Sequence, residues 1–257
     1  MAQCGFLFEA CVDSLFSAIQ AEKGGAGRLE LCAALSQGGI TPSYGMIKAV
    51  LDRVRIPVHV LIRPRAGDFC YTEDEIDVIC EDIHMAGNLK VHGIAFGALT
   101  PDGDIDLQVM TRIISLCKRY ELSMTFHRAF DATRNAEKSL QTLLELGVPR
   151  VLTSGQGETV TEGLPLLKVL VENSMQRISI MPGAGGITKD NAARIVSALD
   201  VTELHGSARS ASDFGQSFVN ETITLAMLGT ATLMVADCEK VRAIVQACKE
   251  ARHNYPA

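Results

Sequence analysis

The chain has no excess of basic residues and no long uncharged apolar run. Its 257 residues include 24 lysines and arginines against 30 aspartates and glutamates, which gives a formal net charge of −6. Proteins that bind nucleic acid or anionic membranes usually present a basic surface. A membrane-spanning helix needs about 20 consecutive apolar residues. We therefore expect neither nucleic acid nor a membrane among its partners.

The N-terminus and the cysteines also lack familiar patterns. The opening MAQCGFLFEACVDS has no basic segment followed by a long apolar stretch, so no secretory signal is evident. Eight cysteines are scattered along the chain without a CxxC pair, which excludes zinc ribbons and thioredoxin-like chemistry. We expect a cytoplasmic, or at least intracellular, protein with free thiols, most of them small buried hydrophobes.

Length and pattern together predict the fold. Hydrophobic residues make up 47% of the chain, enough for a sizeable core, and 257 residues match the roughly 250 of a (β/α)8 barrel. Short apolar runs alternate with amphipathic stretches. The predicted strands cover residues 6–12, 28–32, 57–64, 92–97, 122–128, 150–155, 177–183 and 202–207. We predict an α/β protein whose residues 1–257 form a single (β/α)8 TIM-type barrel domain.

Helix signals between the strands support this fold. Thr72 and Glu75 form a capping-box pattern, and Pro42 is near the first turn of another helix, where proline is tolerated. The predicted helices cover residues 41–54, 72–86, 106–120, 136–146, 163–171, 188–199 and 237–252. The alternative is an open doubly wound sheet, but no GxGxxG follows the first strand. A long excursion at about 208–236 either covers the barrel mouth or forms an oligomer contact.

The two-residue period of the strands places charged side chains inside the barrel. The inward set includes Glu9, Glu30, Glu203, His59, His127, His205 and Arg63. Charged groups are costly there unless they are paired or functional. Most are late in their strands, at the C-terminal mouth where barrel active sites lie. We predict Glu9, Glu30, His127 and His205 as catalytic residues; the alternative is a buried polar network that only stabilises the fold.

Other residues around the mouth suit a small anion. Arginines can hold a carboxylate or phosphate in a fork, although these could instead pair with Asp68, Asp131 or the inner glutamates. Glycine-rich PGAGGIT (182–188) follows the seventh strand and GSAR (206–209) the eighth, where many barrels bind phosphate on backbone N–H groups. The predicted ligand-binding residues are Arg63, Arg65, Arg128, Ser154, Gly183, Gly185 and Ser207.

Two thiols are the sharpest candidate for a metal site. Cys11 and Cys32 each follow an inward glutamate by two residues, on strands predicted to be neighbours. Neighbouring strands are about 4.8 Å apart, so two inward thiols at the same height could approach each other. Soft thiolates favour Cu(I) or zinc. The alternative is that both cysteines only fill the upper layer of the barrel.

A series of motifs resembles the copper homeostasis family CutC. FEACVDS, RLELCAALSQGGITPS, VLIRPRAGDFCYTEDE, GALTPDGDID, TFHRAFD, RVLTSGQ and ELHGSAR occur in this order, over about residues 6–209 and more loosely to the last helix. The resemblance implies a (β/α)8 barrel, a cytoplasmic location, copper tolerance, Cu(I) binding and a homo-oligomer, dimer or tetramer. In some relatives a cysteine follows the histidine of the eighth strand, whereas this chain has Gly206. Copper would then depend on Cys11 and Cys32, with His205 or an exogenous thiol.

Two functions from different classes therefore follow from the sequence. The first is a cytosolic copper homeostasis protein that binds Cu(I) through its inward thiols at the barrel mouth. The alternative is a metal-independent barrel enzyme for a small anionic, possibly phosphorylated, substrate. In that enzyme His127 or a glutamate would be the general acid or base, while arginines hold the substrate's charge. The expected partner is a copper ion in the first case and a small anion in the second.

Overall fold

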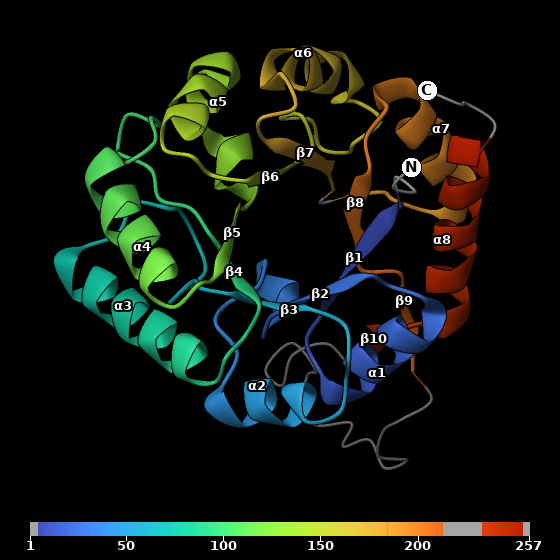
Figure 1. Ribbon diagram of the computed structural model, residues 1–257, viewed down its shortest axis with the longest axis horizontal. Helices are drawn as coiled ribbons and strands as arrows, with labels where there is room; N and C mark the ends of the chain where they lie inside the picture. Colours follow the sequence, from blue (N-terminus) through green and yellow to red (C-terminus); the bar gives the residue numbers. More distant parts are fainter. Residues whose placement is uncertain (1–4, 184, 213–232, 254–257) are drawn as a thin grey trace, which may run out of the picture.

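A ring of eight parallel strands forms the centre of the molecule (Figure 1). The computed structural model describes residues 5–183, 185–212 and 233–253. The strands are β1 (Leu7–Val12), β2 (Arg28–Leu31), β3 (Val58–Leu61), β4 (Gly93–Phe96), β5 (Ser123–Phe126), β6 (Arg150–Thr153), β7 (Ser179–Pro182) and β8 (Glu203–Gly206). Consecutive strands pair from β1 to β7, and β8 pairs with β1 and contacts β7. The predicted TIM-type barrel is confirmed.

Helices surround this ring, one after each strand (Figure 1). In the described residues they are α1 (Leu15–Gly24), α2 (Tyr44–Leu51), α3 (Glu73–Asn88), α4 (Leu107–Arg119), α5 (Ala136–Glu145), α6 (Leu164–Ser174), α7 (Lys189–Leu199) and α8 (Cys238–His253). The predicted ranges left out α1, although Ser14 caps its start and Gly25, at φ 95°, ends it. None of the described helices combines the length and apolar content needed to cross a membrane.

Local capping sets where the helices begin. Helix α2 begins three residues later than predicted because Ser43 is its cap, and the Ser43 hydroxyl accepts a bond from the Met46 N–H. The capping box predicted for α3 is present, since Thr72 accepts from the Glu75 N–H and the Glu75 carboxylate accepts from the Thr72 N–H. Two of the orphan donors at the start of α3 are therefore satisfied.

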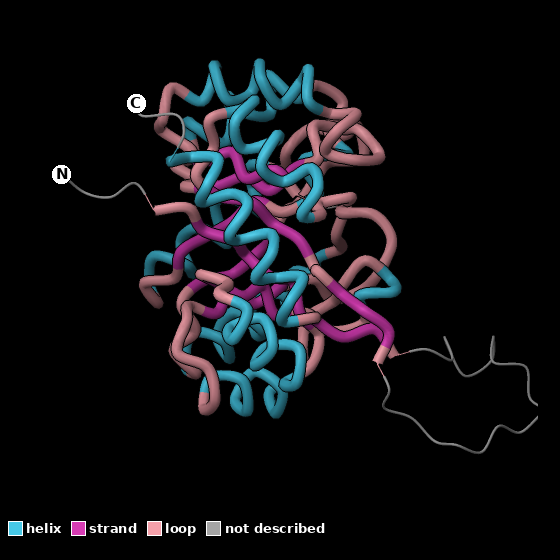
Figure 2. The backbone as a smooth tube through the Cα atoms, turned by 90° about the vertical axis from the view of Figure 1, so that its right-hand side faces the viewer, coloured by secondary structure: helices cyan, strands magenta, loops and turns pink. Residues whose placement is uncertain are grey.

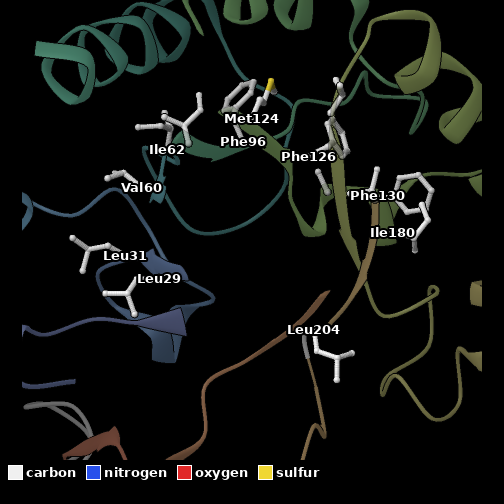
Figure 3. Close-up of a cluster of buried hydrophobic side chains, with 14 of the residues drawn as sticks. Leu29, Leu31, Val60, Ile62, Phe96, Met124, Phe126, Phe130, Ile180 and Leu204 are labelled. Carbon is white, nitrogen blue, oxygen red and sulfur yellow. The ribbon is translucent and has the colours of Figure 1, made fainter. Parts of the chain in front are cut away.

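Each strand presents one face to the helices and the other to the barrel interior. Figure 3 shows Val60, Ile62 and Phe126 in the buried apolar cluster between strands and helices. A separate, smaller cluster inside the barrel contains Cys11, Cys32, Leu61 and Ala95, with Leu35 packed against it. The inner and outer faces predicted from the two-residue period are confirmed, because Val60 and Leu61, adjacent in β3, belong to different clusters.

The predicted excursion at 208–236 is partly described. Residues 213–232 lie outside the described residues, and the segments on either side form a short antiparallel pair, β9 (Arg209–Ala211) and β10 (Met234–Ala236). This ribbon projects from one end of the barrel (Figure 2). The Ser17 hydroxyl of α1 accepts the Ala236 N–H at 3.1 Å, which fixes the base of the ribbon. Barrel cover and oligomer contact both stay predictions.

We expect the substitution Thr72→Ala to destabilise the protein by about 1 kcal/mol, because it removes the capping oxygen of α3. The free energy of unfolding is measured by urea denaturation. The matched control is Thr111→Ala in α4, whose hydroxyl bonds only the Leu107 carbonyl of its own helix. That variant should stay within about 0.5 kcal/mol of the wild type. Equal losses in both variants would contradict the capping account.

Candidate functional site

A cavity of about 300 Å³ opens at the C-terminal ends of the strands. This is the end of a TIM barrel where active sites are built. Nine of the residues predicted from the sequence line it: Cys11, Glu30, Cys32, Arg63, His127, Arg128, Gly185, His205 and Ser207. The strands and the loops that follow them therefore bring most of the candidate residues to one place.

The two thiols meet at the floor of this cavity. Their sulfur atoms are 3.7 Å apart, and both side chains are buried. The prediction that the two thiols lie at the same height on their strands is wrong. In the pairing of β1 with β2, Cys11 is opposite Glu30, and Cys32 is two residues farther along β2. Strands in a closed barrel are tilted and staggered, so an inward side chain fits between two inward neighbours of the next strand. Cys11 therefore has Glu30 on one side and Cys32 on the other.

Cys11, Glu30 and His205 form a compact group of ligand atoms. One ligand atom from each residue is within 4.8 Å of the other two, and all three residues are buried. His205 Nε2 is 3.7 Å from a carboxylate oxygen of Glu30. The other ring nitrogen, Nδ1, bonds Glu9 at 2.8 Å. Glu9 itself does not line the cavity, so it orients His205 from below rather than reaching a bound molecule.

The electrostatics of this group favour one thiolate. A hydrogen bond with Cys32 lowers the pKa of Cys11 to about 5, against burial, and His205 lowers it further. Cys32, sharing that bond as donor, has a raised pKa. Burial alone would lower the pKa of His205, but Glu30, Cys11 and Glu9 raise it well above its usual value. These shifts favour a thiolate at Cys11 beside a protonated His205.

Two arginines that the sequence analysis missed lie deeper in the barrel. Arg28 bonds both Glu9 and Glu203, the latter at 2.5 Å, and Arg150 bonds Glu203 at 2.7 Å. The signal was available, because Arg28 precedes Glu30 by two residues and so has the same inward face. These contacts form a buried polar network of the kind that the alternative describes, and the catalytic role of Glu9 stays a prediction.

The predicted arginine rim is only partly formed. Arg63 lines the cavity and is buried. Arg128 also lines it, with half of its side chain exposed, and forms an ion pair with Asp131 at 3.1 Å. Arg65 does not line the cavity. It binds Glu75 of α3, because that carboxylate at the start of the helix draws the guanidinium away from the mouth.

The small residues of the predicted set divide in the same way. Gly185 and Ser207 line the cavity, whereas Ser154 does not; its buried hydroxyl donates to the Gly157 carbonyl at 2.7 Å and closes a turn. Gly183 also lies behind the lining. A Cβ atom there would be 2.6 Å from the Cβ of His205, so glycine leaves the room that this histidine occupies. Ala184, between the two glycines, lies outside the described residues.

Histidine 59 gives the barrel interior a pH dependence that can be measured. Burial, opposed by Glu9 and assisted by Arg28, lowers the pKa of His59 to about 4. Between pH 6.5 and 4 this histidine binds a proton in the unfolded chain but not in the folded one. The free energy of unfolding therefore decreases as the pH is lowered, by up to about 1.4 kcal/mol per pH unit. Above pH 6.5 this contribution is constant.

We expect His59→Gln to flatten the dependence of unfolding free energy on pH between 6 and 4.5, because the substituted side chain has no proton to take up. Urea denaturation of wild type and variant across this range measures the two slopes. Parallel curves that differ only by a constant offset would contradict the lowered pKa of His59.

Comparison with known proteins agrees with this geometry. The model of the CutC family matches residues 6–210. The copper homeostasis protein cutC homolog of Mus musculus is 47% identical over 249 residues, which cover 96% of this chain and 90% of the mouse protein. The Homo sapiens homolog is 48% identical over 243 residues, covering 93% of this chain and 88% of the human protein.

A solved structure extends the likeness from sequence to fold. The crystal structure of CutC from Streptococcus agalactiae matches with a TM-score of 0.74 and 35% identity, covering 79% of this chain and 98% of that one. The family model, the relatives and the fold all agree with the resemblance carried by the motifs. On these grounds the chain belongs to the CutC family of copper homeostasis proteins.

Proposed function

We propose that the protein is a cytoplasmic Cu(I)-binding protein whose cargo ion is held by Cys11 and Cys32, with His205 as third ligand. The observation that carries this proposal is the 3.7 Å separation of the two sulfur atoms at the cavity floor. The family's role in copper homeostasis supports the choice of metal. The cytoplasm fits, because thiols stay reduced there, and the homo-oligomer implied by the family is part of the proposal.

The spacing of the thiols suits a shared metal ion. Thiolate sulfurs bind zinc at about 2.3 Å, and at a tetrahedral angle two such sulfurs are roughly 3.8 Å apart. Cys11 and Cys32 are already at this separation, so the ion would bind without a shift of β1 against β2. Among biological metals soft thiolate ligands select Cu(I) as well as zinc, and Cu(I) agrees with the family.

The charges around the site affect the protonation of the proposed ligands Cys11, Cys32 and His205. Cys11 is the group closest to its metal-binding form, while Cys32 and His205 would each lose a proton to the incoming cation. The hydrogen bond that Nδ1 of His205 donates to the Glu9 carboxylate leaves Nε2 for the group formed with Cys11 and Glu30. A carboxylate behind a ligating histidine is the usual support of a metal site, since it fixes the ring and raises its basicity.

A metal-independent enzyme is the second candidate. Cys11, His205 and Glu9 also form a chain of contacts from thiol to imidazole to carboxylate. In enzymes with such a chain, the imidazole activates the thiol as a nucleophile and the carboxylate orients the imidazole. The cavity above them is also larger than one ion needs. In this account the thiolate reacts with a small anionic substrate. Weak Cu(I) binding, or binding indifferent to the two cysteines, would favour this candidate.

We expect reduced, anaerobic protein to bind about one Cu(I) per chain in competition with a chelator, and Cys11→Ser, Cys32→Ser to abolish this binding, because a hydroxyl is a poor ligand for a soft ion. The matched control removes two thiols outside the cavity, Cys70→Ser with Cys238→Ser, which are both partly exposed. The control should keep the wild-type affinity. Equal loss in both double variants would contradict the assigned ligands.

A further inference from the structure

Two buried polar groups in the cavity wall lack a hydrogen-bond partner. Among the described side chains, Arg63 Nε and His127 Nε2 are fully enclosed and bond to nothing. Both residues line the cavity, with 6% and 4% of their surfaces exposed. Buried polar groups are nearly always satisfied in folded proteins, so an unsatisfied one in a cavity points to a missing ligand.

The Arg63 guanidinium is fixed in place without a counter-charge. Its two terminal nitrogens donate to the carbonyl oxygens of Gly39 at 3.0 Å and Gly67 at 2.6 Å. The guanidinium is also over the Phe69 ring at 5.0 Å. No described carboxylate is within ion-pair distance of it. A buried guanidinium that contacts two carbonyls, the Phe69 ring and the nearby Tyr71 hydroxyl, but no described carboxylate, attracts an anion.

Four other inner or rim arginines differ on this point. Arg28 and Arg150 bind glutamates, Arg65 binds Glu75, and Arg128 binds Asp131. Their positive charge is therefore already matched within the chain. Arg63 alone among these five keeps its charge available to a molecule in the cavity.

His127 adds a second donor beside it. Its Nδ1 accepts the Ala129 N–H at 3.2 Å, so this nitrogen carries no proton. Burial, and then the charge of Arg63, lower the pKa of His127 to about 3, which keeps the ring neutral. The single ring proton is consequently on Nε2, which is a donor. The His127 ring centroid is 5.1 Å from that of Phe69, so arginine and histidine flank the same aromatic ring.

We propose that Arg63 and His127 form a receptor for an oxyanion group, a carboxylate or phosphate, of a small molecule bound in the cavity. Both free atoms are donors, and a negatively charged oxygen is the acceptor that satisfies them. A volume of about 300 Å³ is at the lower end of small-molecule sites. Half-exposed Arg128 lies at the entrance, where Asp131 already binds its guanidinium. The receptor is independent of copper, since neither residue belongs to the thiol cluster.

The test uses inorganic phosphate and acetate as probes, each against sodium chloride at equal ionic strength. Thermal unfolding is followed for the full chain without copper. We expect at least one probe to give a saturable rise in Tm, about 3 °C at ten times its Kd. A rise with phosphate identifies a phosphorylated ligand, and a rise with acetate alone a carboxylate.

Matched variants locate the receptor. Arg63→Gln and His127→Phe should each lose the Tm rise, whereas Arg65→Gln, an arginine two residues away that does not line the cavity, should keep it. His127→Phe leaves the guanidinium intact, so the test survives if Arg63→Gln fails to fold. No rise with either probe, or an equal rise in all variants, would overturn the proposal without bearing on Cu(I) binding.

The protonation of the two ring nitrogens of His127 can be measured directly by NMR. In the nitrogen-15 spectrum of the wild type, His127 should show a protonated Nε2 and an unprotonated Nδ1 at pH 7. Addition of the binding probe should shift the Nε2–H resonance, and Arg65→Gln should show the same shift. A ring protonated on Nδ1 in the free protein would overturn the proposal.

Discussion

The ion pair between Arg28 and Glu9 inside the barrel influences the charge states of His205 and Cys11, which are nearer the cavity. Burial of Glu9, which has 1% of its surface exposed, raises its pKa, but Arg28 together with His205 and His59 outweighs burial and keeps the pKa of Glu9 well below its usual value. Ionised Glu9 in turn holds His205 by its Nδ1. The histidine then stabilises the thiolate of Cys11. A buried pair of charges in the lower layer therefore sets the chemistry of the upper one.

The two layers of the barrel interior differ in how far their polar groups are paired. The lower half is a closed network in which Arg28, Arg150 and the glutamates satisfy one another. The upper half contains polar groups that are not fully paired. They are the Cys11 thiol with its lowered pKa, the Glu30 carboxyl with its raised pKa, and the donors Arg63 Nε and His127 Nε2 in the cavity wall. TIM barrels commonly divide in this way, since loops at the C-terminal face carry function and the opposite face carries stability.

Most of the fold follows from the sequence because its periods are regular. Alternating strand and helix patterns predicted the barrel, and the capping signal at Thr72 predicted the start of α3. Helix α1 was missed because its polar and apolar residues do not separate onto two faces: Ser17 is buried whereas Phe16 is exposed. The two-residue period also predicted the inner faces, which is why Cys11 and His205 were found without coordinates.

The site was less predictable where partners come from distant elements. Period alone places Arg63 and Arg65 alike at the rim, yet Glu75 of α3 binds one and leaves the other unpaired. The stagger between β1 and β2 depends on closure of the whole ring, so the register of Cys32 could not be read from either strand. Ser154 follows its strand as predicted, but its hydroxyl donates a hydrogen bond to the Gly157 carbonyl within a local turn and is not available to a ligand.

Copper binding between Cys11 and Cys32 inside the barrel can be observed directly. Anomalous X-ray diffraction at the copper edge, on crystals loaded with Cu(I) under reducing conditions, tests it most directly. We expect a peak between the sulfur atoms of Cys11 and Cys32, within bonding distance of His205 Nε2. A peak only at other thiols such as Cys70 or Cys238, or none inside the barrel, would contradict it.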